Sequence, residues 1–173
     1  MFTNRVRILV VGAFVIMMVI AIDMKVYSIA AATAMFIGIV IWGYFNESTI
    51  ILAAKAFHNK DYEKTERLLA QVPNPNWLSK KRRGFYEFIA GGVSLQKQDF
   101  AGAEKHYELA AQYPLRSAND HVAALVHVAN INIRFNNIEK AKAYLQLTDK
   151  YAEKTTAKMK DVIARLHKEL DNK

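Results

Sequence analysis

A short pattern recurs at a fixed step along the latter part of this chain, and it limits the fold more than any other feature. Asp61-Tyr62, Asp99-Phe100 and Asn137-Ile138 each place a good helix N-cap residue before a large apolar one, and the three pairs are 38 residues apart. Such a period, with a helical hairpin in each unit, predicts a solenoid of stacked helices. A small residue or Thr and then a large apolar residue follow each pair: Thr65 and Leu69, Ala103 and Tyr107, and Ala141 and Leu145.

The composition divides the chain into two parts. The 173 residues have a formal net charge of +8 and no cysteine, which excludes disulfides and thiolate metal sites. Residues 1–45 carry only two Arg, one Lys and one Asp, whereas the remaining residues are rich in charge. We therefore expect an apolar part that ends near Phe45, followed by a polar part.

Two apolar segments make up the first part. Residues 26–45 are uncharged, and a helix of 20 residues is about 30 Å long, the thickness of a bilayer core. Residues 8–22 are also apolar but shorter, and Asp23 and Lys25 separate the two segments. We predict a transmembrane helical hairpin over 1–45, with helices at about 6–22 and 26–45. A secretory signal sequence or a re-entrant segment remains the alternative for 8–22.

Basic residues near the helix ends predict the orientation. Arg5 and Arg7 precede the first helix, and Lys55 and Lys60 follow the second. Because basic residues favour the cytoplasmic side, we predict a multi-pass protein of the inner membrane with both termini and the polar domain in the cytoplasm. No proline interrupts residues 26–58, which suggests that the first helix of the polar domain extends the second apolar helix.

Residues 46–154, about two thirds of the chain, resemble three tetratricopeptide repeats (TPRs). The resemblance implies three antiparallel helix pairs, at 46–76, 84–116 and 122–153, in which helix A of each pair faces the ligand. The usual repeat has about 34 residues, so the longer step implies an extra turn between repeats. The packing positions of the family are occupied by Ala53, Gly91 and Ala129, by Thr65, Ala103 and Ala141, and by Tyr107.

Residues 155–173 are expected to close the solenoid. An apolar stripe along 156–170 is typical of an amphipathic helix. We predict a capping helix with a short tail, and a partner-binding helix is the alternative. The expected fold class is therefore all-α: a two-helix transmembrane hairpin, a short TPR-like solenoid and a C-terminal cap.

No pattern of catalytic chemistry stands out. The five histidines are scattered, and the sequence has no HExxH motif, no pair of carboxylates in a catalytic framework and no glycine-rich phosphate loop. We predict that the chain is not an enzyme and has no metal, cofactor or small-molecule substrate.

The TPR resemblance also implies a partner-binding groove lined by helix A. An apolar groove suits a partner helix or peptide, with Asn130 and Arg134 as polar anchors. The family's clamp for a terminal carboxylate is not expected, because Ile50, Ala54 and Ile89 occupy three of its positions. The alternative is that the groove is filled by the chain's own last helix or by the membrane. The candidate groove residues are Phe57, Phe85, Phe88, Ile89, Gln96, His127, Asn130 and Arg134.

One run of basic residues precedes the second helix pair. It consists of Lys80, Lys81, Arg82 and Arg83. The run is either the solvated start of a helix or a contact with anionic lipid headgroups, and nucleic-acid binding is less favoured because the run is short.

These patterns favour a membrane-anchored scaffold that binds an unidentified protein partner through the TPR groove. The alternative is a structural or assembly subunit of a larger membrane complex, held through its transmembrane hairpin. Ala34 and Gly38 form a small-xxx-small step that would favour such helix contacts. A nucleic-acid tether is a minor third possibility, which would show steep salt dependence.

Overall fold

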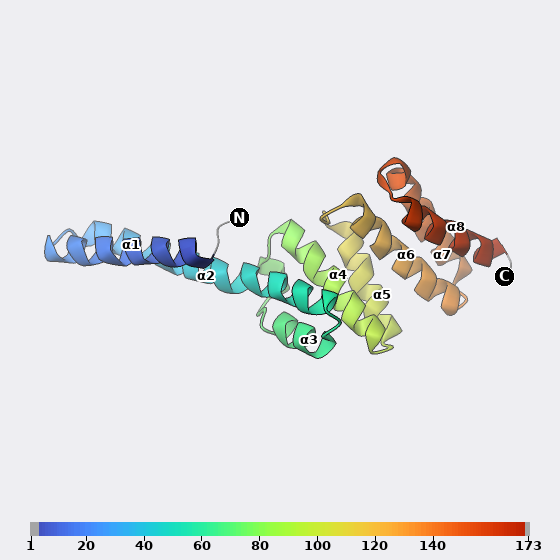
Figure 1. The fold of residues 1–173 in the computed structure, drawn as a ribbon, viewed down its shortest axis with the longest axis horizontal. Coiled ribbons are helices and arrows are strands. Elements are labelled where there is room, and N and C mark those ends of the chain that lie inside the picture. Colours follow the sequence, from blue (N-terminus) through green and yellow to red (C-terminus); the bar gives the residue numbers. More distant parts are fainter. Residues whose placement is uncertain (1–3, 172–173) are drawn as a thin grey trace. The chain divides into compact units, whose positions relative to one another are not determined.

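Most of the residues that the structure describes lie in helices. The computed structural model describes residues 4–171, with side chains over 9–39 and 49–171. Over these residues there is no β-strand, which confirms the all-α prediction (Figure 1). Contacts divide the chain into two units, Met1–Thr49 and Ile50–Lys173.

The first unit is a helical hairpin. It consists of α1 (Asn4–Asp23) and the first part of α2 (Tyr27–His58). Lys25 turns the chain in the left-handed region (φ 58°), and the Val26 amide donates to the Ala21 carbonyl at 2.9 Å. The rings of Phe14 and Phe36 stack with their centroids 6.1 Å apart, so the two helices return along each other.

The prediction that this hairpin crosses a membrane must be corrected. A helix needs about 20 consecutive, mostly apolar residues to span a bilayer core. Over the residues described, no helix combines that length with that apolarity. This finding overturns the predicted multi-pass location in the inner membrane, with both termini and the repeat domain in the cytoplasm. Arg5 and Arg7, which predicted the orientation, lie outside the described side chains, and the tail residues 172–173 lie outside the described residues.

The second unit consists of the end of α2 and a series of antiparallel helices. α2 runs without a break to His58, as the absence of proline predicted. The elements that follow are α3 (Tyr62–Ala70), the 3-10 helix η1 (Pro75–Trp77), α4 (Lys80–Gln96), α5 (Phe100–Gln112), α6 (Ala118–Arg134), α7 (Ile138–Thr148), the 3-10 helix η2 (Asp149–Lys154) and α8 (Ala157–Asp171).

The same turn closes each hairpin of this unit. Its left-handed residue is Lys60, Gln98 or Asn136, with φ near 60° and the same step of 38 residues. The next amide donates back to a carbonyl five residues earlier, which is the hydrogen bond of a Schellman motif. These bonds are Asp61 to Ala56 (3.0 Å), Asp99 to Ser94 (3.0 Å) and Asn137 to Asn132 (2.8 Å).

The residue after the turn also begins the next helix. Asp61 Oδ1 accepts from the Lys64 amide at 3.1 Å, and Asp99 Oδ1 accepts from the Gly102 amide at 2.9 Å, which confirms both predicted N-caps. Asn137 is also the N-cap residue of α7, as predicted, but its side chain makes no such cap bond and instead donates to Asn132 Oδ1 at 3.2 Å.

The helices begin earlier than the predicted pairs. α4 starts at Lys80 and α6 at Ala118, rather than at 84 and 122. Ser79 and Ser117 are their N-cap residues, 38 residues apart, and Ser117 Oγ accepts from the Asp120 amide at 3.1 Å. The basic run therefore lies within the first turn of α4.

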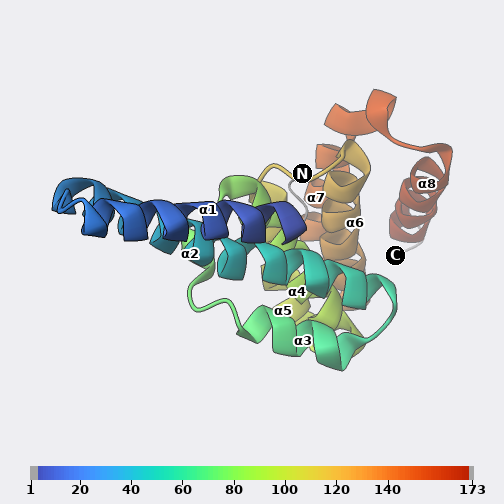
Figure 2. The same cartoon turned by 60° about the vertical axis from the view of Figure 1, so that its left-hand side comes forward.

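Three core clusters join the helices in order. The first links the end of α2 with α3 and α4, the second links α5 with α6, and the third links α6 and α7 with α8. α8 lies beside α6 and α7 (Figure 2). Its Leu166 and Leu170 are buried in the third cluster. The small residues at the packing positions are all buried: Ala53, Thr65, Gly91, Ala103, Ala129 and Ala141.

Gly91 shows why one of these positions is small. A Cβ built on Gly91 would lie 3.1 Å from ring atoms of Tyr107, which is itself only 2% exposed. The glycine therefore lets α4 approach the Tyr107 ring of α5 closely.

Candidate protein-binding surface

The predicted groove residues differ in how accessible they are. Gln96 near the end of α4, and Asn130 and Arg134 on α6, are exposed. Phe57, Phe85, Phe88 and His127 are half-buried, whereas Ile89 is 1% exposed and belongs to the first core cluster. Three polar members of the predicted groove, Gln96, Asn130 and Arg134, are thus open to solvent, whereas His127 and the apolar members contribute mainly to packing.

Phe88 and His127 hold one aromatic stack together with Tyr107. The Phe88 ring meets the Tyr107 ring edge to face at 5.6 Å, and the His127 ring lies parallel to Tyr107 at 4.5 Å. Burial lowers the pKa of His127 below its usual 6.5, so the imidazole is neutral at pH 7. The stack joins α4, α5 and α6, and it gives His127 a packing role.

Phe57 packs over a second glycine. The Phe57 ring meets Tyr62 edge to face at 5.7 Å, and a Cβ built on Gly92 would lie 2.4 Å from Phe57 Cζ. The ring therefore fills the space that the missing side chain of α4 leaves beside the end of α2. This contact explains why Gly91-Gly92 stands inside a helix.

An aromatic and cationic patch forms where α6 ends. The Arg134 guanidinium carbon lies 4.6 Å from the centroid of the Phe100 ring, within range of a cation–π contact. Phe100 also meets Phe135 edge to face at 5.6 Å, and Phe135 is 55% exposed. We call Phe100, Asn130, Arg134 and Phe135 the α6 patch. The groove predicted from the sequence did not include Phe135, although a large apolar residue directly after the end of α6 was a visible signal.

The basic run divides into exposed and buried members. Lys80 and Lys81 are exposed, and Arg82 is half-buried. The side chain of Arg83 is only 14% exposed, and its Nη2 lies 2.7 Å from Glu87 Oε1. Arg83 therefore does not present its charge to solvent with the two lysines.

Glu87 is the centre of a buried charge cluster between α4 and α5. Its side chain is 2% exposed, and Oε2 lies 2.6 Å from Nδ1 of His106. Arg83 Nε and Nη1 are buried with no hydrogen-bond partner in the described part of the chain. The guanidinium therefore depends on the Glu87 carboxylate for its charge balance.

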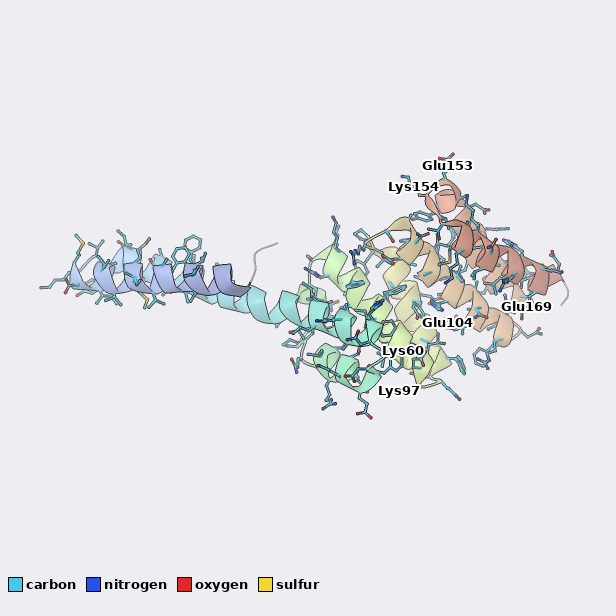
Figure 3. All side chains as sticks on the ribbon, viewed as in Figure 1. Lys60, Lys97, Glu104, Glu153, Lys154 and Glu169 are labelled. Atoms are coloured by element: carbon cyan, nitrogen blue, oxygen red, sulfur yellow. The ribbon has the colours of Figure 1, made fainter. Side chains whose placement is uncertain are left out.

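A second polar network holds α5, α6 and α7 together. Lys140 bridges Glu104 and Glu108, with a distance of 2.8 Å to Glu108 (Glu104 is labelled in Figure 3). Asn132 Nδ2 donates to Glu104 Oε1 at 2.8 Å, and Tyr144 Oη donates to Glu108 Oε1 at 2.9 Å. The network fixes α6, the helix that carries Asn130 and Arg134, against α5 and α7.

The protonation states in this network follow from its contacts. Burial alone would raise the pKa of Glu104, but hydrogen bonds from Lys140 and Asn132 outweigh it and hold that pKa below its usual value. The hydrogen bonds to Glu104 and Glu108 raise the pKa of Lys140. Burial, with the bond to Glu108, raises the pKa of Tyr144 to about 12. Glu104, Lys140 and Tyr144 therefore keep their ordinary charges at pH 7.

No group of three or more His, Asp or Glu side chains is placed to hold a metal ion within the described residues. Comparison of the chain with known protein families, with curated proteins and with solved structures finds no match.

Proposed function

We propose that the second unit is a short TPR-like solenoid that binds a helix or peptide of a partner protein through the α6 patch. The observation that carries this proposal is the recurrence, at the 38-residue step, of one turn geometry together with buried small residues between the helices. Helical repeat arrays of this kind characteristically present extended surfaces to other proteins.

The chemistry of the α6 patch supports protein binding. Arg and aromatic side chains contribute most of the energy in many interfaces, because they combine a large apolar area with a polar group. Arg134 and Phe135 supply both, and the ring of Phe100 under the guanidinium restricts its freedom before a partner arrives.

The position of α8 is relevant to the alternative that this last helix fills the predicted groove. α8 packs against α6 and α7 through Leu166 and Leu170. Asn130 and Arg134 nevertheless remain exposed. α8 therefore leaves these two residues open to a partner, and its exposed polar side suits a cap.

A pair of photo-crosslinking variants tests the proposal. A photoreactive amino acid replaces Asn130 in one full-length variant and Lys105, an exposed residue of α5, in the control. We expect a crosslinked protein in cells only from position 130. Binding of that purified protein should then weaken about tenfold or more in Arg134→Ala, as for other interface arginines. Equal crosslinking at both positions, or no loss of affinity in the variant, would refute the proposal.

A further inference from the structure

A hollow lies at the junction between the second and third hairpins. Its volume is about 610 Å³, which is in the range of sites that hold a ligand. It is formed by the end of α5, the connection to α6, the first turn of α6, and η2. The residues of the extra turn between repeats thus build a surface separate from the α6 patch. The lining residues are Ala111, Gln112, Tyr113, Pro114, Leu115, Ser117, Ala118, His121, Lys150, Tyr151 and Lys154.

The hollow has an apolar wall and aromatic sides. Pro114 and Leu115 come from the connection, and Tyr113 stands beside them. On the other side the Tyr151 ring lies 4.7 Å from the ring of His121, which joins η2 to α6. A ligand in this hollow would therefore meet these apolar and aromatic groups together with polar lining residues such as Gln112 and Ser117.

The charge of the lining has one sign. Lys150 and Lys154 are exposed on η2 and contribute two positive charges (Lys154 is labelled in Figure 3). No Asp or Glu of the described residues is part of the lining. Asp149 and Glu153 are on the same 3-10 helix but do not line the hollow.

Close packing fixes the connection that forms the apolar wall. A Cβ built on Gly84 would lie 2.8 Å from Tyr113 Cβ and 3.0 Å from Leu115 Cδ2. The connection therefore lies directly on α4, at a distance that only glycine allows. On the opposite side, the Thr156 amide donates to Asn119 Oδ1 at 3.0 Å, which ties the chain after η2 to the first turn of α6. Both walls are thus held in place by the fold.

From this lining we infer that the hollow binds an acidic segment of a partner protein, in which Asp or Glu residues flank apolar side chains. The acidic groups would pair with Lys150 and Lys154, and the apolar side chains would lie against Leu115 and between Tyr113 and Tyr151. Complementary charge selects the class of partner, and the apolar wall distinguishes a peptide from a free anion. This site is independent of the α6 patch.

Peptide arrays probed with the full-length chain test the inference. One set of short peptides carries Asp or Glu around apolar residues, and the matched set carries Ser in place of each acidic residue. The pocket variant is Lys150→Glu with Lys154→Glu. The control variant is Lys158→Glu with Lys160→Glu, which makes the same change of charge at exposed positions of α8 outside the hollow.

We expect the acidic peptides to bind and the pocket variant to lose affinity about tenfold or more, while the control variant changes little. The imidazole proton signal of His121, assigned with His121→Gln, should shift when the best peptide is added. Three results would overturn the inference. These are acidic peptides that bind no better than their Ser counterparts, an equal loss in both double variants, or displacement of the peptide by inorganic phosphate at a similar concentration.

Discussion

Removing the charge of Glu87 should destabilise the fold more than any surface substitution. Glu87→Gln keeps the size of the side chain but leaves the Arg83 guanidinium buried, with Nε and Nη1 already lacking partners in the described part of the chain. Breaking a buried ion pair on one side costs about 3–5 kcal/mol, because the remaining charge stays desolvated. Since Arg83 is slightly exposed, we expect the lower end, about 3 kcal/mol.

A double variant separates two contributions to the free energy of unfolding: the penalty for leaving Arg83 without its counter-charge, and the net contribution of the ion pair. Arg83→Met with Glu87→Leu removes both charges and keeps the volume, so its stability should lie within about 1 kcal/mol of the parent chain. Glu63→Gln is the matched control, because Glu63 forms an exposed pair with Arg67 at 3.8 Å. Such pairs contribute about 0–1 kcal/mol.

The assay is urea unfolding of the full-length variants, followed by the helical circular dichroism signal. A loss of about 3 kcal/mol lowers the unfolding midpoint by about 1–3 M, for a typical dependence on urea of about 1–3 kcal/mol per M. If Glu87→Gln costs no more than Glu63→Gln, or if the double variant is less stable than Glu87→Gln, the assignment of Glu87 as the balancing charge is wrong.

Three further results are expected. Gly84→Ala should cost about 1–3 kcal/mol in urea unfolding, because its Cβ would lie 2.8 Å from Tyr113 Cβ, an atom close to the backbone; an unchanged midpoint would count against this contact. Burial raises the pKa of Tyr107 and Tyr144, so the unfolded chain ionises first and the free energy of unfolding falls as pH rises above 10. Tyr107→Phe should weaken this fall, and a pH profile of stability identical to that of the parent chain would contradict the reasoning. Burial lowers the pKa of His127, so the unfolded chain takes up its proton first and stability falls as pH drops below 6.5; His127→Gln should flatten that slope, measured by thermal unfolding against pH.

The hairpins were predictable from sequence because their signals are local. An Asp that ends one helix and starts the next affects only residues within one turn, and its effect is the same in every fold. Ser79 and Ser117 carry the same kind of signal at the same step, so the starts of α4 and α6 were also available from the sequence. Asn137 had the expected residue type, but a hydrogen bond to Asn132, five residues earlier in α6, used its side chain differently.

The candidate site was less predictable because it depends on how the helices are rotated. Phe88 and Ile89 are neighbours on α4, yet Ile89 faces the core and Phe88 meets Tyr107 of α5. Close approach at Gly91 and Gly92 sets the rotation of α4. That rotation depends on the rings of Tyr107 and Phe57, which pack on the two glycines. The four residues of the basic run look alike in the sequence. Arg83 differs because its i, i+4 partner Glu87 is buried where α4 lies beside α5 and contacts His106.

The membrane prediction shows a different kind of error. Apolar composition over 8–22 and 26–45 was taken to mean a bilayer crossing. In the structure a hairpin does form there, with Phe14 against Phe36, but no helix of the described residues meets the requirement for a span. The local turn at Lys25 was recoverable from the charges that separate the two segments, whereas the environment of the helices was not.

The side chain of Asn137 bonds to Asn132 instead of capping α7, and this affects how the second unit opens. The Asn137 side chain bonds to Asn132, Asn132 bonds to Glu104, and Glu104 pairs with Lys140. These contacts connect the turn between α6 and α7 to the second hairpin. At the first turn the side-chain bonds described for Asp61 are local: its carboxylate caps α3, and its carbonyl accepts from the Thr65 hydroxyl at 2.7 Å. Local opening of the last two hairpins should therefore be one cooperative event, and their amide protons should exchange at matching rates, whereas the α2–α3 turn can fray alone.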